Sequence, residues 1–156
     1  MSGEKVANWI NQQLEARNVS VPRERRVVAE IAPLKLVESI RMLKEMGMNN
    51  IGTITGLDLG DRFELIYHLS NDDGVLLNLK TFIARENPRI PSVTAVFPGV
   101  FFYERELMDL FGILVEGIPE GRRYPLPDDW PEGEYPLRKD WKGLSADKGV
   151  TVDGAN

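Results

Sequence analysis

The sequence predicts an α+β protein: a small, mainly antiparallel sheet flanked by helices, followed by an extended proline-rich C-terminal arm. Three observations lead to this fold class. Two amphipathic helical patterns occupy much of the first 47 residues, and three strand-like runs with short turns follow between residues 51 and 82. Beyond Gly112, five of the chain's 10 prolines fall between residues 119 and 136, which disfavours helix and central strand there.

The first helix is predicted from Val6, Ile10 and Leu14, which recur every four positions. Ser2 is placed to cap its start with a side-chain oxygen. The helical pattern breaks over residues 18–22, which include a proline.

A short run of β-branched residues, 26–31, then indicates a strand. Pro33 suits the first turn of a second helix, and Gly47 suits its C-terminal cap. The apolar stripe of this helix consists of Leu36, Val37, Ile40 and Leu43.

Three further strands are predicted at residues 51–59, 62–70 and 75–82, because Gly60-Asp61 and residues 71–74 are strong turn signals. The middle run alternates, and one of its faces carries Phe63, Leu65, Tyr67 and Leu69. Consecutive strands with short turns form an antiparallel meander. We expect the two earlier helices to cover its apolar face.

A third helix is predicted at about residues 99–111. On a helical projection centred on Val100, the polar residues Arg105, Glu106 and Asp109 fall opposite the apolar side. Arg105 and Asp109 are four positions apart, so we expect them to pair along the helix surface.

Glu104 falls between these two sides, at the edge of the apolar arc of the third helix. Burying an unpaired carboxylate costs free energy, so Glu104 either reaches solvent or meets a donor. That donor would be an arginine or backbone amides, in the C-terminal part of this chain or across an interface. The candidate arginines are Arg122, Arg123 and Arg138.

The chain is therefore divided into a core domain of residues 1–112, an interaction arm of residues 113–141 and a tail of residues 142–156 that is expected to be disordered. The arm spaces large apolar residues between its prolines: Leu126, Trp130, Tyr135, Leu137 and Trp141. We expect a semi-rigid extended segment that needs a groove. Its own domain or a second protein would supply that groove.

Composition limits the classes of function. The 19 Lys and Arg residues against 24 Asp and Glu residues give a net charge of −5, which disfavours binding to nucleic acid. The absence of Cys excludes disulfides and Cys-ligated zinc or iron–sulfur clusters in this chain. No stretch approaches the ~20 apolar residues that cross a bilayer, so any membrane attachment is expected through a partner.

The sequence contains few residue patterns that are typical of a catalytic site. The only histidine, His68, lies on the less apolar face of a predicted strand, and one His without Cys is too few for a metal site. Glu104 and Glu106 point to different sides of a helix, and Asp128-Asp129 suits a turn among prolines. No nucleophile elbow, phosphate loop or dinucleotide fingerprint is present. We therefore assign no catalytic, cofactor-binding or metal-binding residue.

Two blocks in the C-terminal half resemble the signature of a known family. Residues 104–113 read ERELMDLFGI, similar to the ERE-x-x-D-x-F-G-I signature of the small hydrophilic C-type subunit of complex I, the thirty-kilodalton family of NADH–quinone oxidoreductase. Residues 126–130, LPDDW, and 135–140, YPLRKD, follow at the family's spacing. Counterparts occur in complex I-like membrane-bound nickel–iron hydrogenases.

The resemblance implies a cofactor-free subunit of the peripheral, cytoplasmic arm of a membrane-bound oxidoreductase complex. Such subunits pack against the large catalytic subunit, which holds the quinone site or the nickel–iron centre, and a small iron–sulfur subunit lies nearby. Their tails extend over the large subunit. The isolated chain is expected to be inactive, with membrane contact only through partners.

The resemblance also implies which residues organise the arm and the interface. They are Glu104, Arg105, Glu106, Asp109, Phe111, Gly112, Trp130, Pro136, Leu137, Arg138, Lys139 and Asp140. One departure from the family pattern is Ile118, where many relatives carry histidine, so no role of that histidine is carried over to this chain.

Several hypotheses stay open. The compact chain favours a hydrogenase-like or other archaeal-type complex, and the C-type subunit of a respiratory NADH or F420H2–quinone oxidoreductase is the alternative. A generic non-redox adaptor is a hypothesis of another class. A stand-alone acid–base enzyme using Glu104 and Asp109 is disfavoured, because the two side chains lie ~140° apart around the helix.

Overall fold

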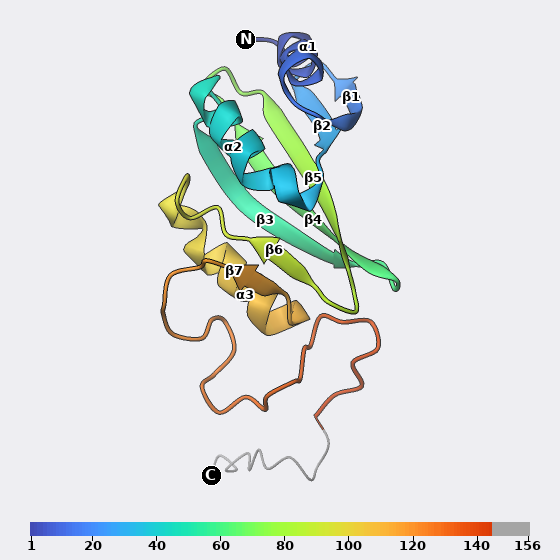
Figure 1. Ribbon diagram of the computed structural model, residues 1–156, viewed down its shortest axis with the longest axis vertical. Coiled ribbons are helices and arrows are strands. Elements are labelled where there is room, and N and C mark those ends of the chain that lie inside the picture. The colour runs from blue at the N-terminus through green and yellow to red at the C-terminus, as the bar shows by residue number, and fades with distance from the viewer. Residues whose placement is uncertain (145–156) are drawn as a thin grey trace, which may run out of the picture.

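Three helices pack on one face of a five-stranded mixed sheet, and a two-stranded sheet lies beside the third helix (Figure 1). This computed structural model describes residues 1–144. The helices are α1 (Gly3–Gln13), α2 (Leu36–Glu45) and α3 (Phe101–Phe111). The strands are β1 (Arg17–Arg23), β2 (Arg26–Glu30), β3 (Asn50–Asp58), β4 (Arg62–Ser70), β5 (Leu76–Ala84), β6 (Arg89–Pro91) and β7 (Leu114–Glu116).

The first two helices form as the sequence predicts. The Ser2 hydroxyl accepts a hydrogen bond from the Lys5 amide at 3.4 Å and caps α1. A turn of 3₁₀ helix at Pro33–Lys35 leads into α2. Gly47 follows the end of α2 with a φ of 112°, a conformation that glycine adopts without strain.

The predicted meander is confirmed, because β3, β4 and β5 are consecutive antiparallel neighbours. The alternation in β4 holds as well, and its predicted apolar face is fully buried: Phe63, Leu65, Tyr67 and Leu69. The helices cover this face, with α3 contributing Leu107 and Phe111 to the same core as α1 and α2. The α+β prediction is therefore correct, with a third helix in the covering layer.

The strand order is β1-β2-β5-β4-β3, and β2 runs parallel to β5, which the sequence does not indicate. Strand β1 is also absent from the prediction, because its sequence, RNVSVPR, resembles the irregular end of a helix. It is an edge strand, where Pro22 is tolerated since the missing amide need not serve a ladder.

The small sheet of β6 and β7 is not predicted from the sequence either. It is parallel, with Ile90 opposite Val115, and both side chains are buried. Each strand has only three residues, too few to give a recognisable alternation. Residues 85–91, which are polar and turn-prone in sequence, thus contain a paired strand.

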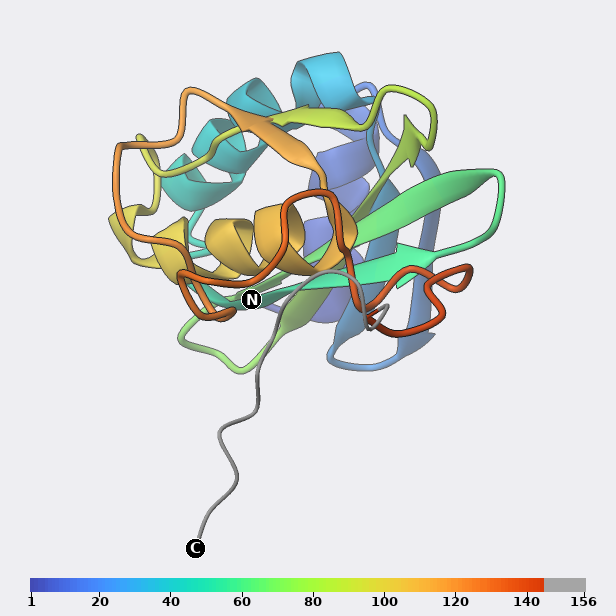
Figure 2. The ribbon, with the colours of Figure 1, turned by 90° about the horizontal axis from the view of Figure 1, so that it is seen from below.

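Beyond β7, residues 117–144 contain no helix or strand and run past α3 to the outer end of β3 (Figures 1 and 2). We call this stretch the C-terminal segment. The tail predicted at residues 142–156 lies outside the described residues from residue 145 onward, so its predicted disorder stays a prediction. Residues 1–144 include no helix with the length and hydropathy of a membrane-spanning segment.

Candidate interaction surface of helix α3 and the C-terminal segment

Glu104 is fully buried, so the solvent-facing alternative is wrong. Its carboxylate accepts hydrogen bonds of 2.7 Å from the Val93 amide and from the Ser92 hydroxyl. Burial raises the pKa of Glu104, and these two hydrogen bonds partly offset that effect. The donor is thus a backbone amide, as one alternative anticipated, but it belongs to the loop after β6. Glu104 ties α3 to that loop.

Arg105 does not pair with Asp109, which corrects the prediction made from their spacing. Its guanidinium donates to the Pro119 carbonyl at 2.6 Å and lies 5.0 Å from the ring centre of Phe101. It thereby holds the first residues of the C-terminal segment. Glu106, one residue on, is half-buried and has no polar partner within residues 1–144.

Asp109 faces the C-terminal segment and is almost fully buried by it. Its carboxylate accepts hydrogen bonds from the Arg123 side chain at 3.2 Å and from the Leu126 amide at 3.1 Å. Arg123 in turn donates to the Trp130 carbonyl at 2.8 Å. A single carboxylate on α3 therefore fixes a loop of the segment through a charged and a neutral donor.

Gly112 ends α3 in the left-handed conformation, with a φ of 70°. A Cβ atom at this position would collide with the Tyr135 ring. Glycine is therefore required twice, for the backbone conformation and for the close approach of the segment.

Arg138 binds the C-terminal end of α3. Its Nε donates to the Phe111 carbonyl at 2.7 Å, and the Leu137 amide donates to the Leu110 carbonyl at 3.0 Å. Carbonyls in the last turn of a helix have no partner within the helix, and a cation there is favoured by the helix dipole. The guanidinium also stacks on Tyr135 at 4.7 Å and lies 5.4 Å from the Phe63 ring centre.

An ionic cluster around the buried Asp58 fixes the end of the segment, and the sequence does not point to its two core members, Asp58 and Arg85. Arg85 pairs with Asp58 and, at 2.8 Å, with Asp140. The Lys139 amide donates to the Asp58 carboxylate at 2.8 Å, and Gly60 donates to it at 2.9 Å. Burial opposes ionisation, but these donors outweigh it and lower the pKa of Asp58 to about 2.

The two tryptophans of the segment close it into a compact loop. The indole of Trp130 donates to the Glu134 carbonyl at 2.9 Å, and the indole of Trp141 donates to the Glu134 side chain at 2.8 Å. The two rings lie 6.2 Å apart. Pro136, which lies between the two tryptophans in the sequence, is half-buried, and the next residue, Leu137, is exposed.

Apolar groups remain exposed on this side of the molecule. The Leu137 residue is 52% exposed although its backbone is bonded to α3, and Phe102 is 56% exposed. Phe102 packs edge-on against Tyr124 at 5.2 Å. Phe102 and Tyr124, together with Arg122 and Leu126, line an open groove of about 660 Å³. Such a surface suits protein contact better than catalysis.

His68 lies away from this surface and bridges three strands. Its ring nitrogens lie 2.9 Å from the Thr55 hydroxyl and 2.9 Å from the Asn78 side-chain oxygen. Across residues 1–144, no group of three or more acidic or histidine side chains is arranged to hold a metal ion.

The chain matches the family model described as "Respiratory-chain NADH dehydrogenase, 30 Kd subunit" over residues 29–146. It is 33% identical to the membrane-bound hydrogenase subunit beta of Pyrococcus furiosus over 90% of this chain and 87% of the relative. It is 39% identical to the C-type subunit of NADH-quinone oxidoreductase from Roseiflexus sp. (strain RS-1), over 70% of this chain and 66% of that subunit. The resemblance drawn from the two blocks is confirmed.

The chain is also similar to proteins from other kinds of complex. The C-type subunit of F(420)H(2) dehydrogenase from Methanosarcina mazei is 37% identical over 76% of this chain and 77% of its own length. A chain of the membrane-bound sulfane sulfur reductase, an archaeal respiratory membrane complex, superposes with a TM-score of 0.81 at 32% identity, over 90% of this chain and 85% of that one. A trypsin-resistant fragment of Nqo5 superposes with a TM-score of 0.65 at 27% identity, over 76% of this chain and 98% of the fragment.

Proposed function

Because the chain belongs to the family of the 30 kDa subunit of respiratory-chain NADH dehydrogenase, we propose that it is a structural subunit of a membrane-bound complex I-like oxidoreductase. It has no cofactor of its own, docks on the large catalytic subunit through the side formed by α3 and the C-terminal segment, and stabilises that subunit. The nickel–iron or quinone site and the iron–sulfur clusters belong to the partners, and this subunit is a peripheral part of the complex on the cytoplasmic side of the membrane.

The observation that carries this proposal is how two neighbouring residues of the second family block (residues 126–130 and 135–140) are oriented. The backbone of Leu137 and the side chain of Arg138 are fixed to the end of α3, while the Leu137 side chain faces solvent. A segment without helix or strand is thus held in one shape before any partner binds. Such preorganisation lowers the entropy lost on association, which favours a docking role.

A hydrogenase-like or related archaeal-type complex is favoured over a respiratory NADH–quinone oxidoreductase. The similarity to the Pyrococcus furiosus hydrogenase subunit and to the sulfane sulfur reductase chain covers 90% of this chain in each case. The similarity to the Roseiflexus subunit covers 70%. An F420H2 or NADH–quinone oxidoreductase is the alternative, and the similarity to the Methanosarcina mazei F(420)H(2) dehydrogenase subunit covers 76% of this chain.

Replacing Leu137 by Glu tests the docking surface. The substitution places a charge on an exposed apolar side chain and leaves the Leu137 amide free to bond to α3. We expect at least about a tenfold lower recovery of the large subunit when the tagged chain is purified from native membranes, since a buried unpaired charge costs more than about 1.4 kcal/mol. The thermal unfolding of the isolated chain should not change.

Leu34→Glu is the matched control, because Leu34 is 95% exposed in the turn before α2 and lies outside this surface. It should leave the recovery of partner subunits unchanged. Equal recovery with Leu137→Glu and with the wild-type chain would contradict the assigned docking surface. A chain that recovers subunits of no redox complex would instead favour the non-redox adaptor.

A further inference from the structure

We propose that the pocket at the outer edge of the Arg138 guanidinium binds a carboxylate, supplied by an Asp or Glu side chain of the large partner subunit. This inference rests on the proposed function, since it names the chemistry of one contact in the same assembly. The pocket has a volume of about 360 Å³. Two cations, Arg138 and Lys142, and two aromatic rings, Tyr135 and Trp141, are among the side chains that line it.

The Arg138 guanidinium uses its inner nitrogen within the chain and leaves its outer nitrogens free. Its Nε donates to the Phe111 carbonyl at 2.7 Å. The two terminal amino groups have no acceptor among residues 1–144, and neither is buried, so both reach solvent. Because each terminal nitrogen of an arginine carries N–H donors, these donors remain for a ligand.

The guanidinium is also held in one orientation before any ligand binds. Arg138 is half-buried, and its guanidinium lies 4.7 Å from the Tyr135 ring centre and 5.4 Å from the Phe63 ring centre. The outer edge of a planar guanidinium matches the two oxygens of a carboxylate. A fixed arginine loses little side-chain entropy when such a ligand binds, which favours binding.

Two carboxylates of the chain line the same pocket, but other groups engage them. Asp140 pairs with Arg85 at 2.8 Å, and the Glu134 side chain accepts the Trp141 indole N–H at 2.8 Å. Arg138 forms no ion pair with any carboxylate of residues 1–144. The outer edge of its guanidinium is therefore left for an anion from outside the chain.

The position of the pocket favours a side chain of the large subunit over a free anion. Leu137, which we assign to the docking surface, is the neighbour of Arg138, so a partner seated on that surface also reaches the pocket. Lys142 is exposed, forms no ion pair in the described part of the chain and adds a second cation. A charge pair strengthens when a docked partner removes the water around it.

Arg138→Lys allows a chemical test of the pocket. The substitution keeps the positive charge and supplies an amine, and a water-soluble carbodiimide joins an amine to a carboxylate in contact with it as an amide. The tagged variant is purified within its complex from native membranes, treated with the carbodiimide and analysed by mass spectrometry. We expect an amide bond between position 138 and an Asp or Glu of the large subunit, which the wild-type chain lacks.

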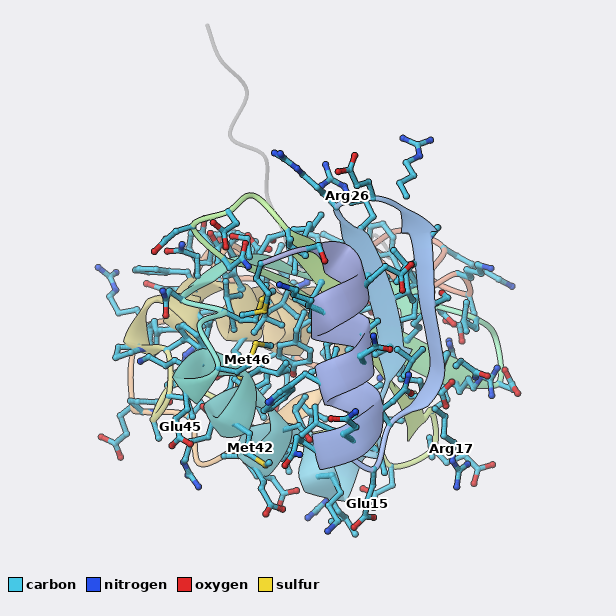
Figure 3. All side chains as sticks on the ribbon, turned by 90° about the horizontal axis from the view of Figure 1, so that it is seen from above. Glu15, Arg17, Arg26, Met42, Glu45 and Met46 are labelled. Atoms are coloured by element: carbon cyan, nitrogen blue, oxygen red, sulfur yellow. The ribbon has the colours of Figure 1, made fainter. Side chains whose placement is uncertain are left out.

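Arg26→Lys and Arg122→Lys are the matched controls. Figure 3 shows Arg26 at the edge of the molecule, and the sheet register places it level with Asn50, whereas the C-terminal segment binds Asp58 at the other end of β3. Arg26→Lys should give no amide with the large subunit. Arg122→Lys should couple to Asp128 within the chain, because their side chains lie 3.1 Å apart.

Lys142→Gln gives an independent readout, because it removes a charge from the pocket and leaves every contact of Arg138 in place. We expect the large subunit to dissociate from the tagged chain about threefold faster, as for a partly exposed ion pair. Lys139→Gln removes the same charge from an exposed side chain that does not line the pocket, and should leave the dissociation rate unchanged.

Several results would overturn the inference. Amide bonds from position 138 to Glu134 or Asp140 alone would show that the chain itself satisfies the outer edge. A complex that contains the large subunit but gives no amide at position 138 refutes the carboxylate contact, while the docking role survives. If Arg138→Lys prevents assembly, equal dissociation rates for Lys142→Gln and the wild-type chain refute the inference. A tagged wild-type chain that recovers no large subunit refutes the proposed function as well.

Discussion

Single residues of the second family block act mainly within the chain. Arg138 lies in the block that the family resemblance assigns to the interface, yet its guanidinium binds the Phe111 carbonyl and two aromatic rings. Asp140 and the Lys139 amide bind Arg85 and Asp58 of the core. The block therefore shapes the surface, and an exposed neighbour such as Leu137 is the better candidate for apolar contact with a partner.

At the residue scale, Gly112→Ala should destabilise the chain by about 2–4 kcal/mol, because a Cβ both strains the left-handed backbone and displaces Tyr135. The matched control is Gly117→Ala. Gly117 has a similar φ of 79° but no atom within 4 Å of the added Cβ, so only about 1 kcal/mol should be lost. Urea unfolding measures both. Equal losses would show that the Tyr135 contact adds no stability.

The depressed pKa of Asp58 predicts how stability depends on pH. Its pKa is about 2 instead of the ordinary 3.8, so the ionised form stabilises the fold by about 2 kcal/mol above pH 4. This contribution declines as the pH falls from 4 towards 2, where the carboxyl becomes protonated in the folded chain.

Asp58→Asn tests this dependence by urea unfolding at several pH values. The variant should be less stable than the wild-type chain at neutral pH, and the difference should shrink towards pH 2. Asp128→Asn removes the same charge from an exposed ion pair and should have almost no effect. A difference for Asp58→Asn that stays constant from pH 7 to pH 2 would contradict the assigned pKa.

At the scale of elements, α3 connects the loop after β6 to the C-terminal segment. Its buried side holds the loop after β6 through Glu104, and its other side holds the C-terminal segment through Arg105 and Asp109. Its last carbonyls bind Leu137 and Arg138. The last residues of the first family block, Asp109 to Phe111, therefore contact residues of the second block directly.

Arg138→Ala should release the C-terminal segment without unfolding the sheet. The substitution removes a charged hydrogen bond and two ring contacts, which together stabilise the attached segment by about 2 kcal/mol. Chymotrypsin cleavage near Trp130 and Tyr135 should therefore be about 30-fold faster. Arg122→Ala is the control, since Arg122 is exposed and forms only a surface pair with Asp128. Unchanged cleavage of Arg138→Ala would show that the segment is held by its other contacts alone.

At the scale of the whole molecule, the core extends past the end of α3. Ile113 and Val115 are buried, and β7 pairs with β6. A chain shortened to residues 1–116 should therefore unfold cooperatively, whereas a chain of residues 1–112 should lose a further ~3–6 kcal/mol, from two buried aliphatic side chains. Circular dichroism melting compares them. Equal melting temperatures would show that β7 adds nothing to the fold.

The sequence by itself determined what depends on neighbours along the chain. The caps and apolar stripes of α1 and α2, the alternation of β4 and the turns of the meander are local patterns, and local patterns survive in the folded chain. The family blocks were readable for the same reason, as contiguous runs of residues. Their order and spacing identified the family before any coordinates were needed.

Only the tertiary structure decided which distant groups meet. Periodicity placed Glu104 at an ambiguous edge, and its donors at Ser92 and Val93 lie on another element. The ionic cluster joins Asp58, Arg85 and Asp140, which are separated by 27 and 55 positions. Burial and hydrogen bonding in three dimensions, not spacing in sequence, select such partners, because an unpaired buried charge is costly wherever its partner lies in the chain.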